Sequence, residues 1–325
     1  MDKLKVAVVG LGKMGLLHSS ILSVIPSVEV VALCDKSFML SRIAKKLFKR
    51  SVVVDDVEKL RDLSLDCAYV TVPIPAHFSI VNDLYSKSAI SNVFVEKTLA
   101  SSWNKAKELC ALSEKIPGAN MVGYMKRFSV TFSKAKSFLD EGVLGELVSF
   151  KGSAFSSDFA NYKQVSKGFS RGGVLSDLGS HIIDLALWFF GDFNVENAII
   201  KSLVDEASED EVSFKVKRSS LTGEFEVSWC RDNYRMPNFA LTVQGSKGSL
   251  TVNDSNVVLE VSGKKPLILY KPGLNDNVAF LLGDPEYYRE DEHFIESMLN
   301  GERAEPSFRT ASRVDYIIDR VKKEA

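Results

Sequence analysis

Residues 5–15 read KVAVVGLGKMG, and this stretch decides how the first part of the chain folds. Its apolar half predicts a fully buried strand, and the residues after it predict a helix. Gly10, Gly12 and Gly15 form the pattern G-x-G-x-x-G at the junction of the two, which is the context that gives this pattern its meaning. Gly10 permits a tight turn, Gly12 lets the backbone approach a pyrophosphate, and Gly15 lets the helix pack closely on the sheet. The stretch therefore predicts a dinucleotide site, with the phosphates at the N-terminus of the helix.

An acidic residue ends the second expected strand, VEVVALCD at 28–35. Asp35 lies twenty residues beyond Gly15, where a carboxylate can accept hydrogen bonds from the ribose hydroxyls of adenosine. The same carboxylate would repel a 2′-phosphate, which favours NAD over NADP. Lys36 and Arg42 reduce that repulsion and leave NADP as an alternative. The competing interpretation is a glycine turn without a ligand and an acidic residue on the surface.

The rest of the first 125 residues alternates short apolar runs with helical patterns. Continuous Val- and Ile-rich strands between helices predict a parallel sheet that is covered on both faces. The fold class expected here is α/β, with an N-terminal doubly wound Rossmann sheet. Further strands are expected at 51–54, 67–72, 93–97 and 120–125, and helices at 38–50, 75–88 and 101–115.

The pattern changes in the second part of the chain. Segments such as 145–156 and 221–230 alternate apolar and polar residues, which predicts antiparallel strands with one solvated face. A long Gly- and Ser-rich stretch at 157–174 predicts a binding loop. We therefore expect a dinucleotide-binding domain at 1–125. An α+β domain at 126–325, with an open, mostly antiparallel sheet, is expected to bind substrate and to mediate oligomerisation.

Composition argues against several classes of protein. Lys and Arg number 41 and Asp and Glu 42, so the net charge is -1 and no strong field attracts nucleic acid or anionic lipid. The four cysteines form no CxxC pair, which predicts a reducing compartment with no disulfide framework and no metal site. The chain starts directly with a strand pattern, and its longest apolar run, near 182–190, is too short for a bilayer. We expect a cytoplasmic protein with no nucleic-acid or membrane partner.

Further cofactor contacts are expected where the parallel strands end, because ligands of open α/β sheets bind beyond the carboxyl ends of the strands. Lys13 and Met14 lie within the glycine motif, Pro73 follows the fourth strand, and Glu96 ends the fifth. We expect these four residues to contact the dinucleotide. His77 reaches its nicotinamide end or, in the alternative interpretation, caps the next helix.

Residues 171–181, RGGVLSDLGSH, open an otherwise apolar helix with ionisable groups. Asp177, His181 and Asp184 follow the spacing i, i+4 and i+7, which places them on one face of a helix. Either they form a polar site, or Asp177 and His181 are a satisfied buried pair that bridges helix and sheet. Lys97, directly after the fifth strand, is likewise either a ligand-facing group or a solvated strand end.

Taken together, these motifs resemble the glucose–fructose oxidoreductase / inositol dehydrogenase (Gfo/Idh/MocA) family. GLGKMG, the Glu96-Lys97 pair and the pattern G-G-x-x-x-D-x-x-x-H occur in the order of that family over nearly the whole chain. The resemblance implies NAD(P)-dependent hydride transfer to or from a secondary alcohol or ketone of a sugar, cyclitol or sugar derivative. It also implies a homodimer or homotetramer through the C-terminal sheet. The catalytic lysine of the family matches Lys97, and its Asp and His match Asp177 and His181.

The chemistry of the three residues fits that activity. The imidazole of His181 titrates near neutral pH and suits proton transfer, and a lysine ammonium stabilises alkoxide charge. Asp177 orients the imidazole or binds a substrate hydroxyl. One departure is Thr98, where the family usually has proline; a non-proline residue rarely adopts a cis bond, which leaves the direction of Lys97 open.

Four further residues are expected to bind a polyhydroxylated substrate. Tyr124, Lys126 and Arg127 follow the sixth strand, and Arg171 precedes a double glycine. Salt bridges between the domains are the alternative role for the first three. A nucleotide-binding regulator or sensor without turnover, and a sugar-nucleotide dehydrogenase, are the alternative functions.

Overall fold

The computed structural model describes residues 3–88, 90–160, 172–204 and 208–325. The chain divides into two compact units. The first unit comprises Met1–Met125 and Asn277–Asp315, and the second comprises Lys126–Asp276 and Tyr316–Ala325. Residues 277–315 thus lie in the first unit, although they follow the second unit's main segment in the chain, and the expected division of roles between 1–125 and 126–325 stays a prediction.

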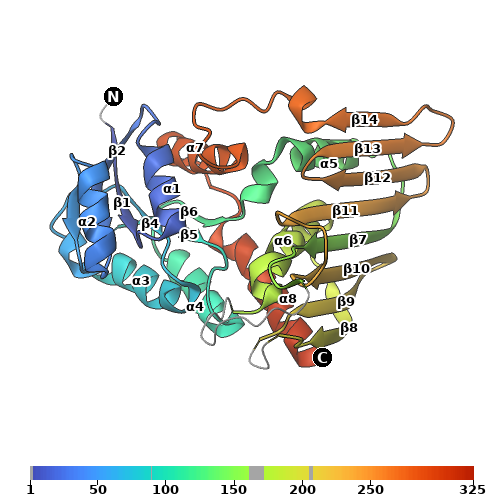
Figure 1. Ribbon diagram of the computed structural model, residues 1–325, viewed down its shortest axis with the longest axis horizontal. Helices are drawn as coiled ribbons and strands as arrows, with labels where there is room; N and C mark the ends of the chain where they lie inside the picture. Colours follow the sequence, from blue (N-terminus) through green and yellow to red (C-terminus); the bar gives the residue numbers. More distant parts are fainter. Residues whose placement is uncertain (1–2, 89, 161–171, 205–207) are drawn as a thin grey trace. The chain divides into compact units, whose positions relative to one another are not determined.

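The first unit is built on a six-stranded parallel sheet in the order β3-β2-β1-β4-β5-β6 (Figure 1). The chain order of the strands reverses between β1 and β4, and ligands of doubly wound sheets bind at that point. The observed order confirms the expected Rossmann sheet. The strands are β1 (Leu4–Val9), β2 (Val28–Cys34), β3 (Val52–Val54), β4 (Cys67–Val70), β5 (Asn92–Glu96) and β6 (Asn120–Gly123).

Helices lie on both faces of this sheet (Figure 1). Several begin at a side chain that satisfies a free backbone N–H group: Ser37 accepts from the amide of Leu40, and Ser102 accepts from that of Lys105. The sequence between the strands predicted the positions of the first four helices well. The helices are α1 (Lys13–Leu22), α2 (Phe38–Leu47), α3 (Ile74–Lys87), α4 (Trp103–Ser113) and α7 (Pro285–Asn300), and α8 (Phe308–Glu324) contains the unit boundary between Asp315 and Tyr316.

Residues from the C-terminal segment complete the first unit. α7 packs on α1, and Asp291 of α7 accepts a hydrogen bond from His18 of α1. After α7, the carbonyl oxygen of Pro306 accepts from the amide of Val122 in β6. These long-range contacts explain why residues 277–315 belong to the first unit.

The second unit contains an eight-stranded sheet in the order β14-β13-β12-β11-β7-β10-β9-β8. Only the β7–β10 pairing is parallel among these strands, so the expectation of a mostly antiparallel sheet is confirmed. No pattern in the sequence predicted β8, β13 or β14. The strands are β7 (Leu147–Phe155), β8 (Asn194–Lys201), β9 (Glu211–Arg218), β10 (Leu221–Ser228), β11 (Asn238–Gly245), β12 (Gly248–Asn253), β13 (Asn256–Val261) and β14 (Leu267–Tyr270).

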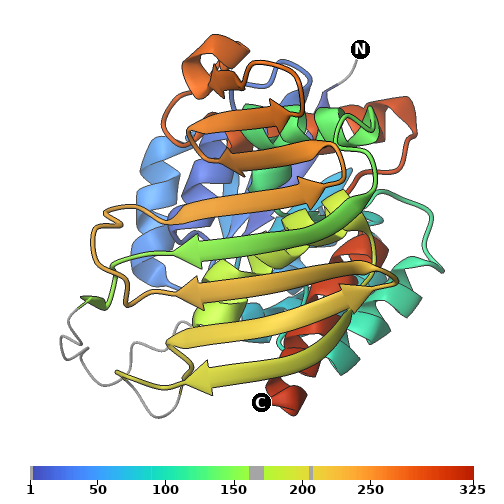
Figure 2. The same cartoon turned by 90° about the vertical axis from the view of Figure 1, so that its right-hand side faces the viewer.

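Two helices pack on one face of this sheet, α5 (Val130–Asp140) and α6 (Ser180–Phe190). Figure 2 shows the opposite face toward the viewer, and no described helix lies over it. That face carries ion pairs between exposed side chains, such as Lys215 with Glu224 and Lys151 with Glu226. The expected alternation of a core face and a solvated face is therefore present.

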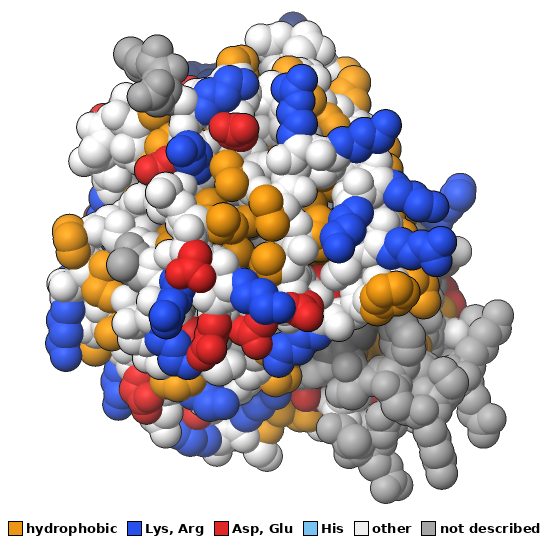
Figure 3. Space-filling view, turned by 90° about the vertical axis from the view of Figure 1, so that its left-hand side faces the viewer, with side chains coloured by type: hydrophobic (Ala, Val, Ile, Leu, Met, Phe, Trp, Pro, Cys, Tyr) orange, Lys and Arg blue, Asp and Glu red, His pale blue; other side chains and the backbone are white. Residues whose placement is uncertain are grey.

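None of the helices in the described part of the chain is long and apolar enough to cross a membrane. Figure 3 shows the surface of the first unit on the side of α2, where Lys and Arg side chains lie among acidic and apolar ones. This mixture agrees with the balanced overall charge.

Candidate cofactor and active site

The first unit contains a cavity of about 900 Å³ beyond the carboxyl ends of β1, β2 and β4. Six of the nine expected cofactor residues line it: Gly10, Gly12, Lys13, Met14, Asp35 and Pro73. The other three, Gly15, His77 and Glu96, are not among its lining residues and make other contacts, which are described below.

The three glycines of the motif differ in what requires them. Gly10 has a φ of +96°, and a Cβ atom there would lie 2.7 Å from the amide nitrogen of Val72. A Cβ atom on Gly15 would lie 1.8 Å from the carbonyl oxygen of Gly10, so these two glycines are needed by the fold itself. At Gly12, no atom lies within 4 Å of the Cβ position. The open space at Gly12 is what a closely approaching pyrophosphate requires, so this loop fits a dinucleotide.

Asp35 links the two loops that border the cavity. Its Oδ2 accepts a hydrogen bond of 2.6 Å from the amide of Leu11, and its Oδ1 accepts one of 2.7 Å from the amide of Ser37. Each carboxylate oxygen has a further lone pair, so the residue retains the capacity to bind ribose hydroxyls. The lining also contains Asp55 and Asp56. This concentration of acidic side chains disfavours a 2′-phosphate.

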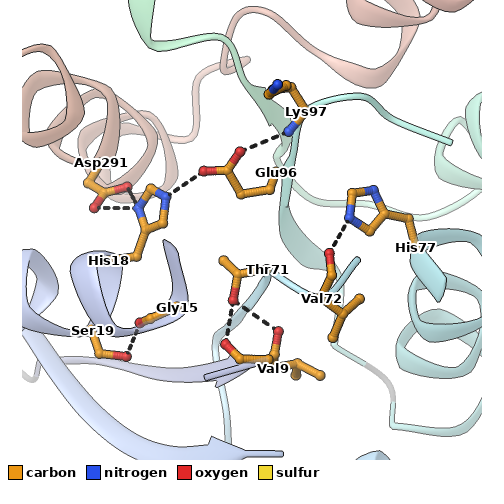
Figure 4. Close-up of polar contacts among 11 residues, drawn as sticks. Val9, Gly15, His18, Ser19, Thr71, Val72, His77, Glu96, Lys97 and Asp291 are labelled. Carbon is orange, nitrogen blue, oxygen red and sulfur yellow. Dashed lines mark hydrogen bonds and ion pairs between the residues drawn. The ribbon is translucent and has the colours of Figure 1, made fainter. Parts of the chain in front are cut away.

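His77 lies between the loops that follow β4 and β5, and Figure 4 shows its contact with Val72. Its Nδ1 lies 2.8 Å from the carbonyl oxygen of Thr98, and its Nε2 lies 2.8 Å from that of Val72. Burial lowers the pKa of His77 more than these two carbonyl oxygens raise it. The neutral ring that burial favours donates to one of these two carbonyl oxygens, and the fully buried ring lies between the two loops. Whether His77 reaches the nicotinamide end of a dinucleotide stays a prediction.

Glu96 is held between a histidine and the backbone (Figure 4). Its Oε1 lies 3.0 Å from Nε2 of His18, and its Oε2 accepts a 3.0 Å hydrogen bond from the amide of Lys97. On the other side of the imidazole, Nδ1 lies 2.8 Å and 2.9 Å from the two carboxylate oxygens of Asp291. Burial alone lowers the pKa of His18, but Asp291 and Glu96 outweigh it and raise that pKa well above its usual value. His18 is an imidazolium between two carboxylates.

No motif in the sequence predicted the roles of His18 and Asp291. The one local signal was a polar residue on the buried side of α1, one turn after Gly15. Its partner Asp291 lies 273 residues further along the chain, so their pairing cannot be read from spacing.

Lys97 follows β5 at the carboxyl edge of the sheet and is half-buried. The peptide bond between Lys97 and Thr98 is cis. The expectation that a threonine in place of the proline would rarely adopt this isomer is therefore not met here.

In the second unit, Asp177 lies in a π-helical turn, Leu175–Gly179, that leads into α6. A π-helical turn is wider than an α-helical one and frequently occurs at functional sites. Four residues are close to one full turn in either type of helix, so the expected common face of Asp177 and His181 stays a prediction. His181 is buried in α6, with its ring edge-on to Phe239 at 5.2 Å between centroids.

Asp184 forms a buried, bidentate salt bridge with Arg127. Nε of Arg127 lies 2.7 Å from Oδ2 of Asp184, and Nη2 lies 2.6 Å from Oδ1. The partner of Asp184 is therefore a basic residue of the 3-10 helix Met125–Phe128. Arg127 also lies over the ring of Trp188, at 5.7 Å.

The remaining expected substrate residues lie in different surroundings. Tyr124 is fully buried at the end of β6. Lys126 forms an ion pair of 2.7 Å with Asp254, and its Nζ lies 5.4 Å from the ring centroid of Phe239. Lys126 and His181 thus contact the same aromatic residue, which sequence reasoning did not select. Arg171 and most of the expected binding loop lie outside the described residues.

All four cysteines are free thiols. Cys34 and Cys67 are buried, and burial raises the pKa of Cys34 to about 12. His18, Glu290 and Asp291 each place one potential ligand atom within 4.8 Å of the others. The expectation that the protein has no metal site therefore stays a prediction.

The fold and the cavity define a two-unit protein of the dinucleotide-binding Rossmann class. Residues 4–124 match the family described as "Oxidoreductase family, NAD-binding Rossmann fold", and residues 132–251 match the "GFO/IDH/MocA C-terminal domain". The chain belongs to the Gfo/Idh/MocA family, as the motifs predicted, and its N-terminal domain is an NAD-binding domain.

Two curated relatives illustrate the family. The chain is 27% identical over 201 residues to scyllo-inositol 2-dehydrogenase (NAD(+)) of Bacillus subtilis, covering 58% of this chain and 54% of that protein. It is 23% identical over 226 residues to levoglucosan dehydrogenase of Pseudarthrobacter phenanthrenivorans, covering 63% and 56%. The chain thus spans about half the length of these relatives. A levoglucosan dehydrogenase solved with NADH has the same fold, with a TM-score of 0.89, 19% identity and coverage of 100% of this chain and 97% of that one.

Proposed function

We propose that this chain is an NAD-dependent dehydrogenase that transfers a hydride between nicotinamide and a secondary alcohol or ketone of a sugar, cyclitol or sugar derivative. The observation that carries the proposal is the place of Lys97. It follows β5 at the same sheet edge where β1, β2 and β4 border the dinucleotide cavity. The named activities of the two curated relatives, on an inositol and on levoglucosan, support this substrate class.

Three residues divide the chemistry. NAD, when bound, accepts or returns the hydride. The imidazole of His181 takes the proton from the alcohol, because a histidine titrates near neutral pH. The ammonium group of Lys97 stabilises the negative charge that develops on the substrate oxygen. Asp177 orients the imidazole or binds a neighbouring substrate hydroxyl. The mechanism requires Lys97 and His181 to meet at the reacting carbon.

Among the proposed substrate residues, Lys126 has the strongest support, because it contacts Phe239 as His181 does. The buried salt bridge of Arg127 with Asp184 favours a supporting role for Arg127. Tyr124 and Arg171 remain proposed contacts to substrate hydroxyls.

The absorbance of NADH tests this function, measured with NAD and a panel of inositols, levoglucosan, glucosides and sugar nucleotides. We expect turnover with at least one hydroxyl-rich compound. Lys97→Met and His181→Ala should each lower kcat by about 10²- to 10⁴-fold and leave the Kd of NAD nearly unchanged. Lys115→Met is the matched control, because Lys115 is an exposed lysine of the first unit, and its kcat should equal that of the wild type.

Two outcomes contradict the assignment. Near-normal turnover of His181→Ala across the pH range would remove His181 from its role. Tight NAD binding with no turnover of any compound on the panel would favour the regulator or sensor. Stronger binding of sugar nucleotides than of free sugars would narrow the substrate class to sugar nucleotides.

We also infer a homodimer or homotetramer through the second sheet, in a reducing, cytoplasmic compartment. The free cysteines agree with such a compartment. Light scattering on the purified protein tests the oligomer.

A further inference from the structure

The segment that carries Lys97 is held by three buried side chains from three helices. His18 of α1 contacts Glu96, His77 of α3 contacts the carbonyl oxygen of Thr98, and Asp315 of α8 contacts the amide of Ala100. Asp315 is fully buried, and burial raises its pKa well above its usual value. The backbone on both sides of Lys97 is thus held by contacts at three positions between residues 96 and 100.

Of these three contacts, the one at His18 requires the largest desolvation free energy, because several charged groups are buried there. A charged imidazole with no exposed surface lies between two carboxylates, in a shell formed by the rings of Tyr69, Phe94 and Tyr287. Glu290 of α7 adds a third buried carboxylate, within 4.8 Å of the ligand atoms of His18 and Asp291. Taking several charges out of water is expensive, and apolar side chains of similar volume are often as stabilising. Fold stability alone therefore does not account for this cluster.

The cluster acts at one point of the backbone. Glu96 connects it to Lys97, because one carboxylate oxygen faces His18 and the other accepts from the Lys97 amide (Figure 4). A neutral side chain at position 18 would leave the Glu96 carboxylate without its cationic partner, free to adopt other rotamers. The hydrogen bond to the Lys97 amide would then be lost.

We propose that His18 is a positioning residue: together with Asp291, it holds the Glu96 carboxylate against the amide of Lys97 and so fixes the direction of the Lys97 side chain. The inference rests on the proposed function, in which Lys97 stabilises charge on the substrate. A displacement of a positioned group by about 1 Å lowers turnover by about 100-fold, so the effect should lie in kcat.

The test separates positioning from stability. His18→Gln retains one N–H donor but no charge. The triple variant His18→Leu, Glu96→Gln, Asp291→Asn removes the facing charges together, so that no unpaired imidazolium or carboxylate of the three remains. Ile21→Val, a mild change in the core of the same helix, is the matched control. The measurements are kcat, substrate KM, the Kd of NAD, the melting temperature and hydrogen exchange at the Lys97 amide.

We expect the triple variant to fold, to bind NAD as the wild type does, and to lose about 10- to 100-fold in kcat. Its Lys97 amide should exchange faster, whereas the amide of Val70 in β4 should not change. His18→Gln should be intermediate, because the amide restores part of the contact. Ile21→Val should change neither kcat nor exchange at Lys97.

The proposal would be overturned if kcat and the hydrogen-exchange rate of the Lys97 amide were both unchanged in either variant. If the triple variant does not fold, His18→Gln alone decides the test. Failure of the proposed function gives a different result. In that case Lys97→Met would not lower turnover, while exchange at the Lys97 amide would still report whether His18 holds Glu96.

Discussion

Asp35 shows how one residue serves both the fold and the ligand. The expected role was to bind ribose and to repel a 2′-phosphate. In the structure its two oxygens also accept from the amides of Leu11 and Ser37, so it fixes the loops on which the dinucleotide would lie. Substitutions of Asp35 can therefore distinguish the effect of its negative charge from the effect of its hydrogen bonds to the two loops.

Asp35→Asn keeps an acceptor for one amide and removes the charge. We expect it to narrow the preference for NAD over NADP, because the repulsion of the 2′-phosphate is lost. Asp35→Ala removes the acceptors as well, so it should weaken both cofactors and lower the melting temperature. Fluorescence titrations with NAD and NADP, together with thermal melts, measure these effects. An alanine variant with wild-type NAD affinity would show that Asp35 does not organise the site.

At the scale of the element, the glycines of the β1–α1 turn are required for different physical reasons. Gly10 and Gly15 are required by contacts within the chain, whereas Gly12 faces open space. A substitution at Gly15 therefore acts on the fold, and a substitution at Gly12 acts on the ligand.

Gly12→Ala should leave the melting temperature within about 1 °C of the wild type, since its Cβ meets nothing, and should weaken NAD binding by about tenfold or more. Gly15→Ala should destabilise the protein by about 1–3 kcal/mol or prevent folding, because its Cβ overlaps the carbonyl group of Gly10. Calorimetric titration with NAD and thermal melts distinguish the two. Equal NAD affinity of Gly12→Ala and the wild type would contradict a pyrophosphate at this loop.

In the second sheet, glycine and phenylalanine face each other across the parallel pair β7–β10. Gly223 pairs with Phe150, and Gly152 pairs with Phe225. A Cβ atom on Gly223 would lie 2.2 Å from the Phe150 ring, so the missing side chain makes room for the aromatic one. The two rings meet edge-on with centroids 5.5 Å apart, which joins the central strands of the core.

For the whole molecule, buried titratable groups set how stability depends on pH. The pKa of His18 is raised by its carboxylates, so its stabilising proton is fully present below the unfolded pKa of 6.5 and is lost as the pH rises through the native pKa. Burial raises the pKa of Asp291 and Asp315, so their contribution to the free energy of unfolding also falls as the pH rises. His77 and His293 have lowered pKa values, so their contribution to the free energy of unfolding rises with pH and reaches its full value once the pH exceeds 6.5.

We therefore expect the free energy of unfolding to fall as the pH rises from about 7 to about 9, because native His18 retains its proton there whereas the unfolded chain has lost it. Thermal melts at constant ionic strength measure this slope. The triple variant at His18, Glu96 and Asp291 should show a shallower one. A melting temperature that rises over this interval would contradict the charged state of His18.

Local patterns in the sequence were sufficient to predict the Rossmann sheet, the glycine loop and the acidic residue at the end of β2. Each depends on a local pattern: apolar runs that bury a strand on both faces, and residues within about 25 positions of one another. The sequence also identified Lys97, Asp177 and His181 through a family resemblance, and their joint action stays a prediction.

Contacts between side chains that are distant in the sequence became visible only in the folded chain. It paired His18 with Asp291 and Arg127 with Asp184, placed His77 between two loops, and assigned residues 277–315 to the first unit. The physical reason is that a buried charge must be satisfied by a partner that the fold brings near, and sequence separation carries no information about that partner. Local periodicity predicts elements, whereas the satisfaction of buried polar groups is a property of the folded chain.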